Sequence, residues 1–319
     1  MVVNQLVVQT NNLCRDFGRV QAVNDISFEV SKGEICGILG CNGAGKTTLL
    51  RILTGTLRPT SGNVKILDYS LPQQAEKVKK YLGYLPQKAA LYQNLTASQN
   101  FAFYCTLFGL TRASSIREVQ ERLFSVYDLR RFRNVLTKKL SGGYQQRLAL
   151  VCALAHQPKI LFLDEPTVGL DPVFRRELWD HLYQLSREEE ITFVITTHYM
   201  EEAERCDKVI FLSEGELLLQ GSPSEIVRDE RWNRVFAFGT DTPFELLEVL
   251  SRESNFSDVY EYGKLIKVIG KKGQEVVPRV EQLAERCGIK IFSVEEDEST
   301  IEDVFVRLTR GGFNDAKKH

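Results

Sequence analysis

No apolar run in this sequence approaches the ~18 residues that a membrane-spanning helix needs. The first residues, MVVNQLVVQTNN, have neither a basic start nor a long apolar core, so we expect no signal peptide. An excess of charge is also lacking, since 41 Lys and Arg residues oppose 42 Asp and Glu residues. Dedicated nucleic-acid-binding proteins usually carry a basic surface, so we expect no nucleic-acid partner. These absences predict a cytoplasmic protein, unless a partner holds it at a membrane.

Metal-ligand spacing is missing as well. The 7 cysteines form no C-x-x-C pair, and several lie inside apolar stretches such as EICGIL and ALVCALA. The 4 histidines are too dispersed to complete a zinc site. We therefore interpret the cysteines as small buried side chains of a protein from a reducing compartment.

What the sequence does contain is an alternation of strand-like and helix-like segments. Residues 1–66 are rich in short β-type runs, and residues 67–140 are mostly helical in period, including a helix predicted over 73–83. A short strand predicted over 81–87, YLGYLPQ, interrupts these helices. From residue 148 onward, buried strands alternate with helices, which is typical of a mostly parallel sheet. A capping-box pattern, SPSE at 222–225, then begins a segment whose β-α-β-β-α-β order is ferredoxin-like.

A phosphate-binding loop is the strongest motif. Residues 40–47, GCNGAGKT, match the pattern G-x-x-x-x-G-K-S/T between an apolar run and a helical run. The glycines would let backbone N–H groups surround phosphate oxygens, Lys46 would lie between the β- and γ-phosphates, and Thr47 would bind Mg²⁺. A glycine-rich turn with a chance lysine is the alternative, which the flanking pattern disfavours. The expected ATP contacts are Gly40, Cys41, Asn42, Gly43, Ala44, Gly45, Lys46, Thr47 and Thr48.

Two adjacent acids follow a second buried strand. The run KILFLDEP is apolar up to Leu163 and then charged, which would bring Asp164 and Glu165 to the carboxyl edge of the sheet. We expect Asp164 to hold the Mg²⁺ shell and Glu165 to accept a proton from an attacking water. An acid that caps a following helix is the alternative for this position.

The order of these motifs resembles a known family. After the loop come LSGG at 140–143, LDEP at 163–166 and a histidine at 198, and over residues 5–221 the chain resembles the ATP-binding subunit of an ABC transporter. The resemblance implies an α/β P-loop NTPase fold with a β-subdomain and a helical insertion at about 88–145, in a domain of residues 1–221. Residues 222–319 would form a small accessory α+β domain, which we expect to stabilise a dimer.

The resemblance also assigns residue roles. Phe17 would stack on adenine, although a core phenylalanine is the simpler alternative. Gln87 would touch Mg²⁺ and the attacking water, although it could equally be a surface loop residue. His198 would contact the γ-phosphate rather than be an ordinary core histidine, and Asp171 would bridge two subunits.

The LSGG segment implies a second copy of the ATPase. In this family the segment faces the phosphate loop of another subunit, so each ATP would lie between two chains, in the simplest case a homodimer. Integral membrane permease subunits would be the other partners. The residues expected to act in trans are Ser141, Gly142, Gly143 and Gln145.

The residues of the later motifs resemble those of one class of these ATPases. TVGLDP, THYMEEAE and the C-terminal STIEDVFVRLTRGG are similar to the ATPases of ABC-2 type exporters. An importer ATPase is the nearest alternative, but its usual C-terminal extension is an all-β barrel. A single set of motifs argues against a ribosome-acting ABC protein, and the short gap before LSGG argues against a DNA-repair ATPase. In the helical insertion we expect Phe101, Phe103, Tyr104 and Phe108 to be mainly core, although some could line a groove for a membrane subunit.

Overall fold

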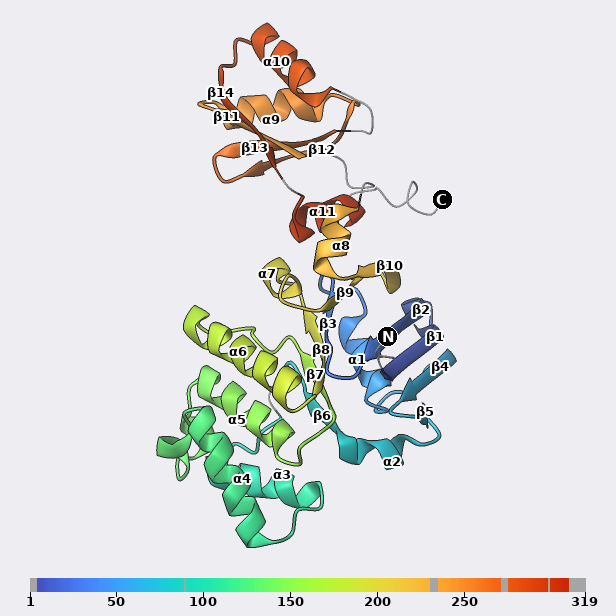
Figure 1. Ribbon diagram of the computed structural model, residues 1–319, viewed down its shortest axis with the longest axis vertical. Coiled ribbons are helices and arrows are strands. Elements are labelled where there is room, and N and C mark those ends of the chain that lie inside the picture. Colours follow the sequence, from blue (N-terminus) through green and yellow to red (C-terminus); the bar gives the residue numbers. More distant parts are fainter. Residues whose placement is uncertain (1–4, 89, 230–234, 271–274, 298, 310–319) are drawn as a thin grey trace. The chain divides into compact units, whose positions relative to one another are not determined.

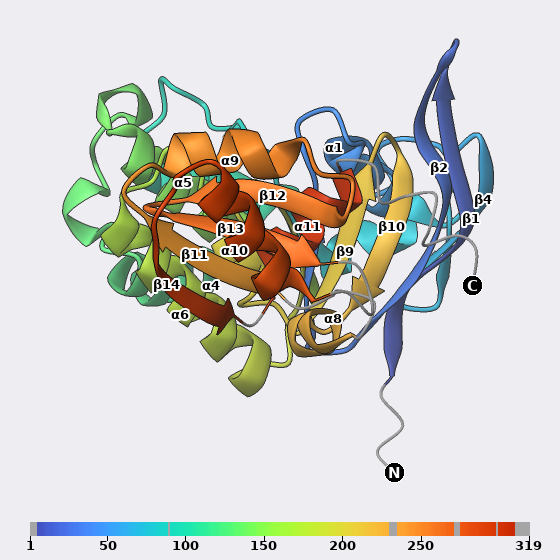
Figure 2. The same ribbon diagram turned by 90° about the horizontal axis from the view of Figure 1, so that it is seen from above.

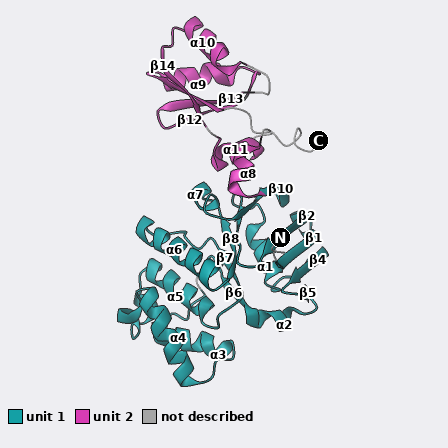
Figure 3. Cartoon of the chain, in the orientation of Figure 1, with its two compact units in different colours: residues 1–220 teal, residues 221–319 magenta. Residues whose placement is uncertain are grey.

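The computed structural model describes residues 5–88, 90–229, 235–270, 275–297 and 299–309. The chain divides into two compact units, Met1–Gln220 and Gly221–His319 (Figure 3). Each unit is described by itself. Within the described part of the chain, no helix combines the length and the apolarity that crossing a membrane requires.

The first unit is built on a ten-stranded sheet with the order β5-β4-β1-β2-β10-β9-β3-β8-β7-β6. Strands β3, β6, β7, β8 and β9 pair in parallel, whereas β1, β2, β4 and β5 pair antiparallel. The strands are β1 Leu6–Phe17, β2 Val20–Ser31, β3 Ile35–Leu39, β4 Ser61–Ile66, β5 Tyr69–Leu71, β6 Leu82–Leu85, β7 Ile160–Asp164, β8 Thr192–Thr197, β9 Lys208–Ser213 and β10 Glu216–Gly221.

Helices flank this sheet. Figures 1 and 2 both show α4 and α5 on one side of the unit and β1, β2 and β4 on the opposite side. The helices are α1 Lys46–Leu53, α2 Ala75–Val78, α3 Ala97–Leu107, α4 Ala113–Val126, α5 Gly142–Leu154, α6 Pro172–Glu188 and α7 Met200–Ala203. Single 3₁₀ turns are η1 Lys79–Tyr81, η2 Arg130–Phe132 and η3 Thr137–Lys139.

Burial explains the parallel centre of the sheet. Every residue of β3, β7 and β8 is buried, as the continuous apolar runs predict for strands that are covered on both faces. The registers Leu163↔Ile195 and Leu39↔Thr197 bring the carboxyl ends of β7, β8 and β3 to one edge. This edge is where ligands bind in open α/β sheets.

Helix α1 joins the antiparallel and parallel parts of the sheet through one apolar core. Its Leu49, Leu50, Ile52 and Leu53 are buried in the same cluster as side chains from β1, β2, β3, β4, β7 and β8. Burying a leucine or isoleucine contributes roughly 1.5–3 kcal/mol per side chain. This packing holds the start of α1, and with it the phosphate loop, at a defined place on the sheet edge.

The helix expected over 73–83 is shorter than its sequence period suggests. Only Ala75–Val78 is α-helical, Lys79–Tyr81 is a 3₁₀ turn, and β6 already starts at Leu82. Tertiary pairing decides the difference, because Leu82 lies opposite Ile160 in the parallel ladder with β7. The strand predicted over 81–87 is confirmed, because β6 occupies Leu82–Leu85 within it.

The second unit contains a four-stranded antiparallel sheet with the order β12-β13-β11-β14. With the helices after β11 and β13, this is the ferredoxin-like arrangement that the β-α-β-β-α-β cadence predicts. Its elements are α8 Pro223–Arg228, β11 Val235–Thr240, α9 Pro243–Ser251, β12 Phe256–Tyr262, β13 Leu265–Gly270, α10 Val276–Arg286, β14 Ile291–Asp297 and α11 Ile301–Thr309.

Capping explains where two helices of this unit begin. Ser222 caps α8 in a capping box with Glu225, and Pro223 occupies the first helical position, as the sequence predicts. In α11 the Asp303 carboxylate accepts a hydrogen bond from Thr300 N–H at 2.7 Å, and Thr300 Oγ1 accepts from Asp303 N–H at 3.1 Å. Lys267 Nζ of β13 lies 3.7 Å from the same carboxylate, which fastens α11 to the sheet.

Candidate functional site

The phosphate loop has a backbone that only glycine adopts without strain. Gly43 and Gly45 have φ angles of 84° and 99°, in the left-handed region. A Cβ on Gly45 would lie 2.2 Å from the carbonyl oxygen of Ala22, so no side chain fits there. Gly45 caps α1 without a side-chain bond, so the amide groups of the first helical turn remain available to an anion at this terminus.

Lys46 is a buried cation in the middle of the loop. Its side chain is 5% exposed, and its Nζ donates to the carbonyl oxygens of Gly40 at 2.7 Å and Cys41 at 3.2 Å. The same Nζ lies 3.3 Å from Glu165 Oε1. A buried ammonium needs such partners, and phosphate oxygens would satisfy it in the same way.

Asp164 stands at the carboxyl end of β7, next to the start of α1. Its Oδ1 accepts hydrogen bonds from Thr47 Oγ1 at 3.2 Å and from Thr196 Oγ1 at 2.7 Å. A hydroxyl and a carboxylate oxygen at this separation fit a hard cation such as Mg²⁺, which takes few protein ligands and keeps several waters. Gln87, the third expected metal ligand, donates a hydrogen bond to Glu165, and in the described part of the chain it makes none with Asp164 or Thr47.

Glu165 follows in a backbone conformation that is unusual for its type. Its φ is 48°, which costs roughly 1–3 kcal/mol for a non-glycine residue. Thr196 holds this geometry, because the Glu165 N–H donates to Thr196 Oγ1 at 3.0 Å. Helix α6 begins only at Pro172, so Glu165 does not cap it, and the helix-cap alternative for this acid is wrong.

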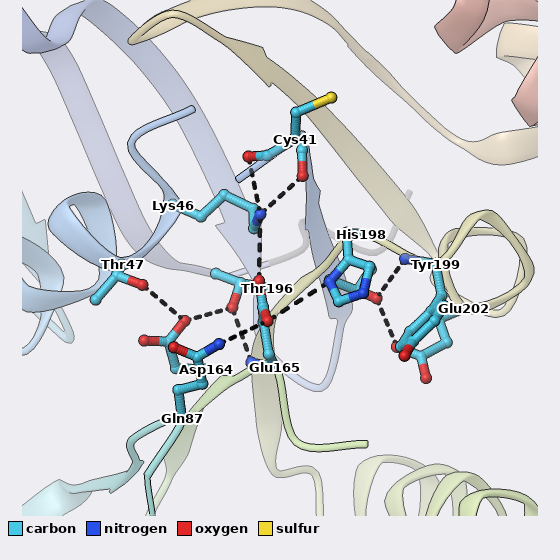
Figure 4. A network of polar contacts seen from close by, with 12 residues as sticks. Cys41, Lys46, Thr47, Gln87, Asp164, Glu165, Thr196, His198, Tyr199 and Glu202 are labelled. Atoms are coloured by element: carbon cyan, nitrogen blue, oxygen red, sulfur yellow. Dashed lines mark hydrogen bonds and ion pairs between the residues drawn. The ribbon is translucent and has the colours of Figure 1, made fainter. Parts of the chain in front are cut away.

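Three groups surround the Glu165 carboxylate. Gln87 Nε2 donates to Oε2 at 2.9 Å, His198 Nδ1 lies 3.5 Å from Oε2, and Lys46 Nζ lies on the Oε1 side (Figure 4). An amide and an imidazole thus fix the orientation of the carboxylate, and the Lys46 ammonium lies on its other side. A carboxylate in this position can accept a proton from a water molecule.

These residues enclose one cavity of about 480 Å³. It brings together most residues that the sequence analysis singles out, from the phosphate loop, the end of β7 and the end of β8. Gln87 is an exposed residue of the loop after β6 and also lines the cavity, and His198 lines the cavity and is not a core residue. The lining residues are Ala22, Asn42, Gly43, Ala44, Gly45, Lys46, Thr47, Thr48, Gln87, Glu165, Val168 and His198.

Phe17 is the last residue of β1 and is not a core residue. Its exposed fraction is 47%, and the Arg15 guanidinium carbon lies 4.5 Å from its ring centroid. The core alternative for Phe17 is therefore wrong. An exposed aromatic ring can stack on a flat heterocycle, and the adenine contact of Phe17 remains a prediction.

The LSGG residues lie apart from this cavity. Ser141 is the N-cap of α5, its side chain makes no capping bond, and a Cβ on Gly142 would meet no atom within 4 Å. Gln145 donates to the Leu140 carbonyl oxygen at 3.1 Å. None of the cavity-lining residues comes from α5. The structure thus presents an open helix N-terminus, which suits an anion, away from the chain's own phosphate loop.

Asp171 caps a helix of its own chain. It is the N-cap of α6, and its Oδ1 accepts a hydrogen bond from the Phe174 N–H at 2.9 Å. The side chain remains exposed, so a contact with another subunit is sterically open. Its bridging role remains a prediction.

A second concave surface lies between β6, α3 and α5. It is an apolar groove of about 370 Å³, and Lys79 is the one charged residue among those that line it. Of the four aromatic residues expected in the core, only Phe101 is fully buried, whereas Phe103 is exposed. Tyr104 and Phe108 line the groove instead. The expectation of a core position is therefore wrong for these three residues.

The sequence analysis did not identify Thr196, whose hydroxyl forms hydrogen bonds with both Asp164 and Glu165. Its hydroxyl donates to Asp164 and accepts from the Glu165 N–H, although it is fully buried in β8. A signal was present, because two threonines interrupt the apolar run ITFVITTH directly before His198. A buried hydroxyl must find a hydrogen-bond partner, and the end of the neighbouring strand is where such a partner lies.

Comparisons with known proteins agree with this geometry. The family described as "ABC transporter" matches residues 23–168. The probable multidrug ABC transporter ATP-binding protein YbhF of Escherichia coli is 40% identical over 222 residues, which are 70% of this chain but only 38% of YbhF. The Nod factor export ATP-binding protein I of Sinorhizobium fredii is 32% identical over 310 residues, which cover 96% of this chain and 87% of that protein.

A solved structure extends the comparison to three dimensions. A dimeric ATP-binding cassette in a post-hydrolysis state with ADP and Pi bound superimposes with a TM-score of 0.63 at 28% identity. The match covers 67% of this chain and 98% of that cassette. It therefore corresponds in extent to the first unit, which carries the cavity and the LSGG helix.

Proposed function

The chain belongs to the ATP-binding proteins of ABC transporters, which are ATPases, and from this premise we propose that it drives an exporter of the ABC-2 type. Two copies would close around two ATP molecules and pass the motion to membrane permease subunits at the inner face of the cell membrane. The exported cargo would be a drug, a lipid, a polysaccharide or another envelope compound.

One observation carries the dimeric part of this proposal. The cavity is lined by the phosphate loop together with Gln87, Glu165 and His198, yet the exposed N-terminus of α5 with Ser141 takes no part in it. A second anion-binding helix terminus has a use if it covers the nucleotide of another copy. Two-fold symmetry then completes both sites with the same two surfaces.

Each group of residues in the site would have a separate chemical role. Lys46 and the loop amides neutralise the phosphates, and Thr47 and Asp164 would hold Mg²⁺, which supplies further charge neutralisation when bound. Glu165 accepts the proton of the attacking water, with Gln87 and His198 orienting its carboxylate. The aromatic face of Phe17 is available for adenine stacking.

The export class rests on relatives and on the second unit. The Nod factor export protein aligns along nearly the whole chain, including residues that form the second unit. That unit is a ferredoxin-like α+β fold in its described part, unlike the all-β barrel expected of an importer ATPase. We propose that residues 1–221 form the ATPase domain, with 88–145 as its helical subdomain, and that 222–319 stabilise the dimer.

A Ser141→Asp change tests the composite site. Aspartate is a good N-cap, so α5 should stay folded, but its carboxylate would repel the phosphate of the facing subunit. We expect ATP binding to one chain to remain within about threefold, while the ATPase rate falls roughly a hundredfold. The rate is measured by phosphate release, and dimerisation by sedimentation with ATP in a Glu165→Gln background.

Ser222→Asp is the matched control, because Ser222 is also a serine N-cap, at α8. It should leave both measurements unchanged. If the Ser141→Asp chain hydrolyses ATP at the normal rate, or if the natural chain is fully active as a strict monomer, the composite-site proposal is wrong.

We propose that the apolar groove receives a cytoplasmic helix of the permease. Burial raises the pKa of the Tyr104 phenol and of the Cys152 thiol, so both stay neutral in the groove at physiological pH. Apart from Lys79, the described lining of this concave surface is uncharged and mostly apolar, which fits the apolar face of an amphipathic helix, and Lys79 would face an acidic residue beside it.

A Tyr104→Ala change should weaken this docking roughly tenfold, because tyrosines in concave interface centres often contribute more than about 1 kcal/mol. Binding is measured by copurification and titration with the permease subunit. Leu107→Ala is the control, since Leu107 lies on the same helix, is 63% exposed and does not line the groove. Equal losses in both variants, or none in either, would contradict the groove assignment.

A further inference from the structure

A buried carboxylate outside the catalytic cavity has no role in the chemistry described so far. Glu202 lies on α7 and is 2% exposed. Its Oε2 accepts a hydrogen bond from Thr197 Oγ1 at 2.7 Å, whereas its Oε1 is buried and has no hydrogen-bond donor among the described residues. Burying a charge that is only partly compensated is unfavourable, so its position calls for a functional reason.

Glu202 acts on the turn that carries His198. Thr197 Oγ1, which donates to Glu202, also accepts the N–H of Tyr199 at 3.0 Å. The backbone is therefore fastened on both sides of His198, as Figure 4 shows. The imidazole Nδ1 lies 3.5 Å from Glu165 Oε2, and its ring centroid lies 4.2 Å from that of Tyr199.

Arg175 connects the same turn to α6. Its Nε lies 3.9 Å from Glu202 Oε1, and its guanidinium carbon lies 4.5 Å from the ring centroid of Tyr199. Arg175 Nε is buried and has no hydrogen-bond partner among the described residues, so Tyr199 and Glu202 are the groups that hold this side chain. At 3.9 Å the ion pair is loose, and a small shift of either element would tighten or break it.

The other end of this connection is the loop of Asp171. The Arg175 N–H donates to the Asp171 carbonyl oxygen at 3.0 Å, and the Asp171 side chain caps the same turn through the Phe174 N–H. Arg175 thus lies one helical turn from Asp171, within a rigid and well-capped segment. A displacement of the Asp171 loop would move the guanidinium together with it.

We propose that Arg175 and Glu202 are positioning residues that couple the Asp171 loop to His198. When a second copy binds at Asp171, the first turn of α6 moves and brings the Arg175 guanidinium closer to Tyr199 and Glu202. This movement positions the His198 imidazole next to the nucleotide. The inference rests on the proposed function, in which Asp171 faces the partner and His198 faces the γ-phosphate. It adds a route by which dimer closure reaches the catalytic histidine.

Two conservative substitutions test the coupling. Glu202→Gln keeps an acceptor for Thr197 but removes the charge, and Arg175→Lys keeps the charge but removes the planar group over Tyr199. For each we expect unchanged ATP affinity and KM, a kcat that is roughly tenfold lower, and a Hill coefficient for ATP hydrolysis closer to one. The double variant should be no slower than the slower single variant, because both act through one contact.

Three controls separate the possible outcomes. Arg187→Lys, on the same helix in an exposed pair with Asp207, should change neither kcat nor cooperativity. If Glu202→Gln and Arg175→Lys lower only the melting temperature, with normal kcat per folded molecule, the residues are structural and the coupling is refuted. His198→Ala tests the premise separately: a normal kcat there refutes the role of His198 itself, whereas a low kcat beside normal Arg175→Lys and Glu202→Gln chains refutes the coupling alone.

Should Glu202→Gln fail to fold, Arg175→Lys still decides the question. The Arg175 side chain is 28% exposed, so this exchange leaves the packing of α6 largely intact. A loss of cooperativity in this variant supports the coupling, and a Hill coefficient equal to that of the natural chain overturns it.

Discussion

In the presence of ATP, a Glu165→Gln chain is expected to bind nucleotide normally, to hydrolyse it roughly a hundred- to ten-thousandfold more slowly than the natural chain, and to accumulate as a dimer. The amide has the shape of the carboxylate but cannot accept a proton from water. It also removes a negative charge that lies 3.3 Å from Lys46 Nζ, so the loop cation becomes fully available to phosphate. ATP should therefore remain between the two chains instead of being consumed.

Phosphate release measures the rate, and sedimentation velocity with ATP measures the dimer. The control is Glu177→Gln, which removes an exposed acid that pairs with Arg147 at 3.4 Å on the surface of α6. That variant should turn over ATP at the natural rate. If the Glu165→Gln chain hydrolysed ATP at the natural rate, Glu165 would not be the base, because the glutamine amide at this position cannot accept a proton from water.

Lys46→Met should abolish both nucleotide binding and hydrolysis. Methionine keeps much of the apolar stem but lacks the ammonium, which is the buried cation at the phosphate loop and makes two hydrogen bonds to loop carbonyls. Removing one such donor in a preorganised site typically costs a factor of roughly 10²–10³, and here the same group also attracts the ground-state phosphates. We therefore expect kcat/KM to fall by at least that factor and the Kd for ATP to rise strongly.

Equilibrium titration with a fluorescent ATP analogue measures the affinity. Lys32→Met is the matched control, because Lys32 is a surface lysine that pairs with Glu190 far along the sheet from the loop. It should bind and hydrolyse ATP as the natural chain does. The two largest effects thus differ in kind, since Glu165→Gln should keep affinity and lose turnover, whereas Lys46→Met should lose both. Tight ATP binding by Lys46→Met would contradict the assignment of the loop.

Local rules were sufficient for much of the fold and the site. Gly43 and Gly45 occupy left-handed conformations that the loop pattern requires, and Lys46 starts α1 directly after them. The apolar run before Asp164 forms a buried parallel strand that ends at the acids. In each case the decisive interactions lie within a few residues or follow from burial on both faces of a strand, so the sequence pattern predicts them.

Local sequence rules could not predict the contacts between segments that are distant in the sequence. Thr196 meets Asp164 across 32 positions and Gln87 meets Glu165 across 78 positions. Nothing in the local sequence states that the ends of β7 and β8 are neighbours or that the loop after β6 reaches Glu165. Likewise, the period of the helical insertion does not show that Tyr104 and Phe108 face a groove instead of the core.

The amino-acid sequence by itself therefore determined the parts: the anion-binding loop, the acidic strand end, the capped helices and the α/β alternation. The tertiary structure alone decided how these parts meet, namely that Thr196 hydrogen-bonds to both acids and that Glu202 and Arg175 hold the turn of His198. The physical reason is that backbone conformation and burial periodicity are properties of neighbouring residues, whereas a hydrogen bond across a sheet depends on strand order and register, which the whole core sets.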